Sequence, residues 1–181
     1  LLELVRSHAK STVIYRGVKS SDYELIPRVG RRTWKKKKLT AKQEQNILQL
    51  FKQRAIVHLH RVLDAWELLA TAQHYGLPTR LLDWTRNPLV AVFFAVEQEF
   101  EGDSAIYAYR NNKHLRIEDH PDPFKVDRVA RVVPNHVTIR ITVQSGLFTI
   151  HPRPGDPFES AEIEKFVIPG SNRKAIKRAL S

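Results

Sequence analysis

The central stretch of this 181-residue chain reads Gln73-His74-Tyr75-Gly76-Leu77-Pro78-Thr79-Arg80-Leu81-Leu82-Asp83-Trp84-Thr85. Gly76 and Pro78 end the helical pattern that precedes them, and Pro88 fits the first turn of a further helix. The residues from Thr79 to Asn87 are therefore expected in a loop or short turn, which carries several polar groups between two apolar helices.

The segment before this stretch has the apolar spacing of a long amphipathic helix. Thr40 is its predicted N-cap, with Gln43 at the capping-box position. The apolar period then runs through Ile47, Leu50, Phe51, Val57, Leu63, Trp66, Leu69 and Ala70. Residues 90–95, after Pro88, are almost all apolar, so their helix is predicted to be buried on most of its surface.

Extended segments stand at the start of the chain and in its second half. A β-branched and aromatic run from Thr12 to Tyr15 predicts a strand that ends at Gly17. Residues 105–109, 137–143, 147–150 and 163–168 are further strand candidates, and residues 171–180 are predicted to form a terminal helix with Ser171 as cap. This order predicts an α+β domain, in which helices from the first half pack on a mostly antiparallel sheet. The lack of regular strand-helix alternation argues against a doubly wound nucleotide fold.

Composition narrows the classes of function. The length predicts one domain over residues 1–181. The absence of cysteine excludes disulfides, zinc-cysteine sites and thiol nucleophiles. The absence of methionine leads us to expect a fragment of a longer protein. No apolar run approaches the roughly 18 residues that cross a bilayer, so we expect no membrane partner and a cytoplasmic location.

The charge is strongly basic, with 30 Lys and Arg against 19 Asp and Glu and a formal net charge of +11. The excess is concentrated from Arg28 to Lys42 and in the last predicted helix, at Arg173, Lys174, Lys177 and Arg178. Such basic runs have two interpretations. They can bind the phosphate backbone of a nucleic acid, with release of counterions, or they can be a solvated part of the surface. A non-catalytic module that binds nucleic acid or a partner protein is therefore one functional hypothesis.

The polar residues of the central stretch support two interpretations. In the structural one, Asp83 pairs with Arg80 and caps the helix that begins near Pro88. In the functional one, the same groups line a site together with Gln73 and His74. A histidine can act as an acid or base near neutral pH, but a lone one is more often a packed, hydrogen-bonded group.

The triplet Tyr15-Arg16-Gly17 and the segment from Trp66 to Ala95 resemble the bacterial FRG domain family, which is named for a Phe-Arg-Gly triplet. The resemblance includes the central stretch and Pro88, Ala91, Phe94 and Ala95, and it continues at Gln144-Ser145-Gly146-Leu147-Phe148 and Ile168-Pro169. It implies a bacterial or phage-related protein.

A second resemblance is to arginine-serine-glutamate ADP-ribosyltransferases, which place such a triplet on their first core strand and a Glu-x-Glu near a later strand. It implies an NAD-using enzyme, a toxin or antiphage effector. NAD, a dinucleotide, would then be bound by Tyr15, Arg16, Gly17, His74, Arg80 and Asp83. The planar guanidinium of an arginine can donate paired hydrogen bonds to the phosphate oxygens of the cofactor. A carboxylate can stabilise the positive charge that develops on the ribose as nicotinamide leaves.

The catalytic residues that this second resemblance implies are Thr85 and Glu164, the latter within Glu162-Ile163-Glu164. The Glu-x-Glu is equally compatible with a solvated strand edge. Gln144 is an alternative third element, since the neighbouring Gly146 lets backbone approach a ligand closely. Its other interpretation is a turn residue between two hairpin strands.

Overall fold

The computed structural model describes residues 12–31, 39–55, 62–110, 114–134 and 147–180. The chain divides into two compact units. Unit 1 comprises Leu1–Glu24, Asp83–Asn112 and Glu159–Ser181, and unit 2 comprises Leu25–Leu82 and Lys113–Phe158. Helices and two three-stranded sheets are present, so the predicted α+β class is confirmed. The single domain over residues 1–181 stays a prediction.

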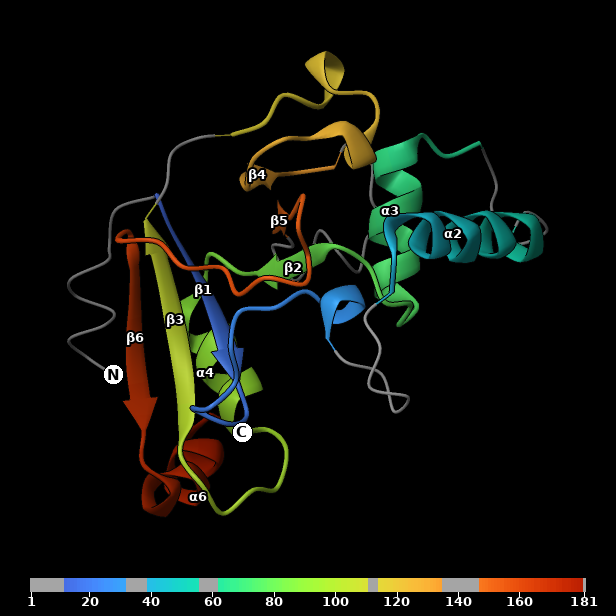
Figure 1. The fold of residues 1–181 in the computed structure, drawn as a ribbon. Helices are drawn as coiled ribbons and strands as arrows, with labels where there is room; N and C mark the ends of the chain where they lie inside the picture. Colours follow the sequence, from blue (N-terminus) through green and yellow to red (C-terminus); the bar gives the residue numbers. More distant parts are fainter. Residues whose placement is uncertain (1–11, 32–38, 56–61, 111–113, 135–146, 181) are drawn as a thin grey trace. The chain divides into compact units, whose positions relative to one another are not determined.

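Unit 1 is built on a sheet in the order β1 (Val13–Val18), β3 (Ser104–Arg110) and β6 (Ile163–Ile168) (Figure 1). Both strand pairs are antiparallel. Each strand is rich in the β-branched and aromatic residues that suit a pleated, half-buried surface. The strand predictions at residues 12–17, 105–109 and 163–168 are confirmed to within a residue or so.

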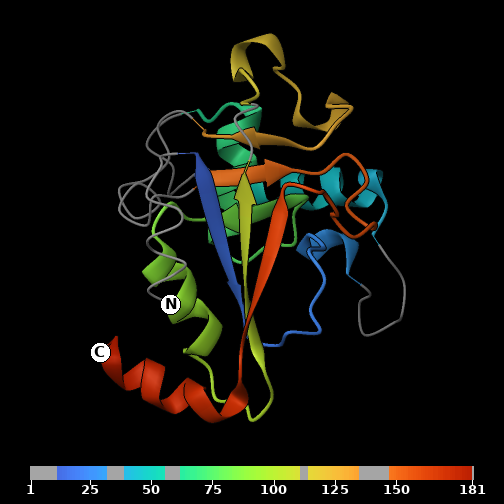
Figure 2. The ribbon, with the colours of Figure 1, turned by 90° about the vertical axis from the view of Figure 1, so that its left-hand side faces the viewer.

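Helix α4 (Pro88–Val96) packs against β1, and α6 (Gly170–Ala179) packs against α4 (Figure 2). The α4 side chains that join the core are small or β-branched: Ala91, Val92, Ala95 and Val96. Leu89, Phe93 and Phe94 are 42%, 40% and 44% exposed. The prediction that this helix is buried on most of its surface is therefore wrong, because the sheet covers only the alanine side.

The terminal helix α6 begins at Gly170, not after a Ser171 cap as predicted. The Gly170 N–H donates to the carboxylate of Asp103 at 2.8 Å, so a residue distant in sequence satisfies this helix end. Arg173 of α6 is buried and donates to the carbonyl oxygens of Ala95 and Gln98 at 2.7 and 2.5 Å. α6 thereby caps the C-terminal end of α4.

Unit 2 contains α2 (Ala41–Ala55), α3 (Ala65–His74) and a sheet in the order β2 (Leu81–Trp84), β5 (Leu147–Ile150) and β4 (Ala130–Val132). β2 begins in unit 2 and ends in unit 1. Among the described residues, this unit also contains the short 3-10 helices η1 (Arg28–Gly30), η2 (Ile117–Asp119) and η3 (Pro123–Lys125). Its core joins α3 to β4 and β5 through Trp66, Leu69, Val132, Phe148 and Ile150.

The predicted capping box at the start of α2 is confirmed: the Thr40 N–H donates to Gln43 Oε1 at 2.9 Å, and the Gln43 N–H donates to Thr40 Oγ1 at 3.3 Å. The prediction of one long helix is wrong, because a separate helix, α3, begins at Ala65. Asp64 caps it, accepting from the Glu67 N–H at 2.8 Å while the Glu67 carboxylate accepts from the Asp64 N–H. This second capping box starts a new helix although the apolar period continues across it.

The segment predicted as a loop over residues 79–87 contains the strand β2. Leu81, Leu82 and Trp84 are buried, and the exposed Asp83 hid this pattern among polar neighbours. The sequence also gave no sign of the three-residue β4. The strand predicted over residues 137–143 lies outside the described residues. In the part of the chain that the structure describes, no helix has the length and apolar character needed to cross a membrane.

Candidate functional site

The two faces of the unit 1 sheet carry different side chains, because successive residues of a strand point to opposite faces. The register places Arg16 opposite Tyr107, and Tyr107 opposite Lys165. One position along, Tyr15, Ala108 and Glu164 form the neighbouring row. Arg16, Tyr107 and Lys165 therefore lie side by side on one face of the sheet, and we call these three residues the Arg16 row. Tyr15 and Glu164 lie on the other face.

Arg16 is held by Asp83. Its Nη1 donates to the carbonyl oxygen of Asp83 at 2.7 Å and lies 3.5 Å from the carboxylate oxygen Oδ2. Tyr15 and Thr85 bring these residues together, since each donates its backbone N–H to the other's carbonyl oxygen, at 2.7 and 2.8 Å. The predicted pairing of Asp83 with Arg80 is wrong: its ion-pair partner in the structure is Arg16.

The other two members of the Arg16 row interact with each other and with the chain that leaves β1. The Lys165 ammonium lies 5.6 Å from the centre of the Tyr107 ring. The Tyr107 hydroxyl donates to the carbonyl oxygen of Tyr23 at 2.8 Å, and Lys165 Nζ donates to that of Ser21 at 2.6 Å. The row thus places two cations on either side of an aromatic ring.

Gly17 and Tyr15 face α4. A Cβ on Gly17 would lie 1.8 Å from the carbonyl oxygen of Ala91, so only glycine allows this approach of helix to strand. Tyr15 is buried, which raises the pKa of its hydroxyl above 10.0; the charge of Arg110 opposes this rise and that of Glu164 adds to it. Of the predicted cofactor-binding triplet, Tyr15 and Gly17 thus lie on the face toward α4, and Arg16 lies on the opposite face.

Glu164 lies on the face opposite Arg16, so the two do not line one site. Its carboxylate forms an exposed ion pair with Arg110, with Nη2 and Oε1 3.3 Å apart. The ADP-ribosyltransferase resemblance implied one site, with Arg16 binding the cofactor and with Thr85 and Glu164 as catalytic residues. The strand register, which sequence spacing does not reveal, separates the glutamate from the arginine.

Thr85 is buried beside β1, and its hydroxyl accepts from the Asn87 N–H at 3.1 Å. Asn87 in turn caps α4, accepting from the Leu89 N–H at 2.9 Å. The helix cap predicted at Asp83 is therefore Asn87. The carboxylate of Asp83 is left on the side of Arg16, with its side chain 60% exposed.

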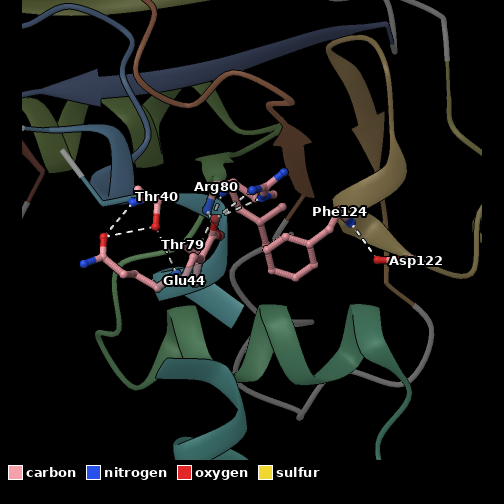
Figure 3. Close-up of polar contacts among 8 residues, drawn as sticks. Thr40, Glu44, Thr79, Arg80, Asp122 and Phe124 are labelled. Atoms are coloured by element: carbon pink, nitrogen blue, oxygen red, sulfur yellow. Dashed lines mark hydrogen bonds and ion pairs between the residues drawn. The ribbon is translucent and has the colours of Figure 1, made fainter. Parts of the chain in front are cut away.

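Arg80 belongs to unit 2 and is buried there. Its Nη2 lies 2.9 Å from Glu44 Oε2, its Nε donates to the same oxygen at 3.1 Å, and its backbone N–H donates to Glu44 Oε1 at 2.9 Å (Figure 3). The guanidinium also lies 4.3 Å from the centre of the Phe124 ring. Burial raises the pKa of Glu44, and the hydrogen bonds and charge of Arg80 oppose that rise. These contacts give Arg80 a structural role in joining α2 to the start of β2.

His74 is also in unit 2, at the last residue of α3, where its ring meets that of Tyr75 edge-on with centres 5.5 Å apart. Gln73 accepts a hydrogen bond from the Thr79 hydroxyl. Gln144 lies outside the described residues. The structure therefore brings together Arg16, Asp83 and the backbone of Thr85 in unit 1, and it places His74 and Arg80 in the other unit.

Sequence reasoning missed Tyr107, Lys165 and Glu44. Tyr107 and Lys165 occupy alternate-face positions in predicted strands, but only the register shows that they flank Arg16. Glu44 stood in a charged helix and gave no sign of burial. Among the described residues, no cluster of three or more His, Cys, Asp or Glu side chains is arranged to hold a metal ion.

Comparison with known proteins agrees with the family resemblance of the Tyr15-Arg16-Gly17 triplet and the central stretch. The FRG domain model matches residues 11–104, more than half of the chain, and this interval includes β1, β2 and α4. No curated protein and no solved structure matched. The chain belongs to the FRG domain family.

Proposed function

We propose that this FRG domain chain is an NAD-using enzyme of the ADP-ribosyltransferase type, and that the Arg16 row of unit 1 binds the cofactor. The observation that carries the proposal is the register Arg16–Tyr107–Lys165, two cations on either side of an aromatic ring on one sheet face. An arginine fork recognises phosphate oxygens in pairs, and a lysine supplies a second positive charge.

The spacing of this row suits a diphosphate. Neighbouring strands lie about 4.8 Å apart, so the backbones of Arg16 and Lys165 are about 10 Å apart across β3. Both side chains are long, and they can reach adjacent phosphate groups between these backbones. Asp83 fixes the guanidinium through its carbonyl oxygen at 2.7 Å, which reduces the orientational freedom that ligand binding would otherwise have to remove.

The reaction breaks the bond between the nicotinamide nitrogen and C1′ of its ribose. Nicotinamide leaves with the bonding electron pair, a lone pair of the acceptor forms the new bond to C1′, and the acceptor gives up a proton. A carboxylate beside C1′ stabilises the positive charge that develops and can take this proton. We assign this role to Asp83, since its carboxylate is on the side of Arg16 and Glu164 is on the other face.

Thermal unfolding with and without NAD tests this proposal. NAD should raise the melting temperature of the wild-type chain, and Arg16→Ala should abolish the shift. Arg110→Ala is the matched control, since Arg110 lies in the same sheet but pairs with Glu164 on the opposite face, and it should keep the shift. Chromatography of the mixture should detect free nicotinamide. No NAD-dependent shift and no nicotinamide would refute the proposal.

A second function is supported by α6. Residues 170–179 contain no acidic side chain, and Lys174 and Arg178 are exposed. Arg28, at the start of the predicted basic region, donates to the carbonyl oxygen of Gly76 at 2.7 Å, and residues 32–38 lie outside the description. Binding of nucleic acid through α6 predicts an affinity that falls steeply with salt and weakens in Lys174→Ala with Arg178→Ala. Affinity that does not change with salt would exclude it.

A further inference from the structure

The chain that leaves β1 receives side-chain hydrogen bonds from β3 and β6. We call residues 19–24 the strap. Side chains from three elements hold its main-chain carbonyl oxygens: Ser104 and Arg173 donate to Lys19 at 2.8 and 3.2 Å, Lys165 to Ser21 at 2.6 Å, and Tyr107 to Tyr23 at 2.8 Å. Hydrogen bonds from side chains of the sheet and of α6 therefore hold the backbone of the strap in place.

The two ends of the strap are held differently. Lys19 is bonded to Ser104 and Arg173, which are both buried. Further along the strap, the bond from Lys165 to Ser21 is exposed to solvent, and the bond from Tyr107 to Tyr23 is partly buried. The side chains of residues 22–24 are exposed as well. Lys19 is held by two side-chain donors, whereas Ser21 and Tyr23 are held by one each, and an exposed hydrogen bond opens readily. The Lys19 end is therefore the hinge, and residues 21–23 are the part that can lift.

The same contacts occupy two of the three members of the Arg16 row, Tyr107 and Lys165. Lys165 lies across the Tyr107 ring and donates to the strap, and Tyr107 itself is only 8% exposed. Asp22 and Glu24 add two carboxylates to the strap, which disfavour an approaching anion. A diphosphate can therefore engage the row fully only when Lys165 exchanges the Ser21 carbonyl for a phosphate oxygen.

We propose that the strap is a movable cover of the Arg16 row, closed by Tyr107 and Lys165 and displaced when a diphosphate binds. This inference rests on the proposed function, whose cofactor site it regulates. Closure lowers the apparent affinity, because the binding-competent open state is only a fraction of the population. Lys165 acts in both states, whereas the Tyr107 hydroxyl acts only in the closed one.

Tyr107→Phe separates these roles, since it removes the hydroxyl that closes the strap and keeps the aromatic ring and Lys165. We expect this variant to bind inorganic pyrophosphate and NAD about threefold to tenfold more tightly than the wild type, the range of one hydrogen bond. Tyr75→Phe, which removes an exposed tyrosine hydroxyl in unit 2, is the matched control and should leave both affinities unchanged. Titration calorimetry measures them.

Hydrogen exchange gives an independent measure of the strap. The Ser21 N–H donates to the Asp103 carbonyl oxygen at 2.7 Å, and the Tyr23 N–H donates to that of Ser20 at 3.1 Å. Both amides should exchange faster in Tyr107→Phe, and faster in the wild type when pyrophosphate is added. Ligand binding that Tyr107→Phe leaves unchanged or weakens overturns the strap but not the proposed function. Binding of pyrophosphate without NAD overturns only the proposed function, and binding of neither ligand overturns both.

Discussion

Gly17 of β1 lies directly against the main chain of Ala91 in α4: a Cβ on Gly17 would be 1.8 Å from the Ala91 carbonyl oxygen and 2.8 Å from the Ala95 nitrogen. Both atoms belong to helix backbone, which cannot move aside as a side chain can. The third residue of the Tyr15-Arg16-Gly17 triplet therefore sets the distance between strand and helix.

Gly17→Ala should lower the free energy of unfolding by about 3 kcal/mol, at the upper end of the range for overpacked cores. Gly102→Ala is the control, because its Cβ would meet only the ring of Phe100, which is partly exposed and can rotate away. Urea denaturation measures both variants. Equal stability of Gly17→Ala and the wild type would contradict this packing.

The fold was predictable where a local pattern decided it. The β-branched and aromatic runs of β1, β3 and β6 and the capping box at Thr40 predicted the correct elements. The break between α2 and α3 was missed, because the apolar period continues across it and the signal is the polar pair Asp64 and Glu67. β2 was missed because Asp83, the residue that pairs with Arg16, interrupts its apolar run.

The candidate site was predictable only in part, for a physical reason. Arg16 and Asp83 were identified through the family resemblances, but their pairing depends on the bridge between Tyr15 and Thr85, which are distant in sequence. Whether a strand residue shares a face with Arg16 depends on register, and a one-residue shift exchanges the faces. That shift is the difference between Lys165, which lies in the Arg16 row, and Glu164, which does not.

The buried ion pair of unit 2 should show strong coupling between Glu44 and Arg80. Either Glu44→Leu or Arg80→Met alone leaves a buried charge without its partner and should cost about 3–5 kcal/mol. The double variant removes both charges, so it should cost less than the sum of the two single changes. Chemical denaturation of all four proteins completes the cycle, and additive losses would show that the pair has no coupling.

The titration of Glu44 predicts how stability depends on pH. Burial raises the pKa of Glu44 above its ordinary value of 4.5, so the folded state holds this proton more tightly than the unfolded state. The contribution to stability is therefore fully present below pH 4.5 and is lost as the pH rises through the folded pKa. Glu44→Gln cannot titrate. The free energy of unfolding of the wild type minus that of Glu44→Gln should fall as the pH rises above 4.5. A difference that rises would contradict the direction of the shift.

The two carboxylates on opposite sheet faces make opposite predictions for catalysis. If Asp83 stabilises the charge that develops at C1′, Asp83→Asn should reduce nicotinamide release from NAD by about 100-fold, the loss typical of one electrostatic group. Its effect on stability should stay below about 1 kcal/mol, because its ion pair with Arg16 is largely exposed. Glu164→Gln breaks only the pair with Arg110 on the other face and should leave the rate unchanged. If Glu164→Gln abolishes release and Asp83→Asn does not, the glutamate implied by the ADP-ribosyltransferase resemblance is the catalytic one. The Arg16 face would then not be the reacting face.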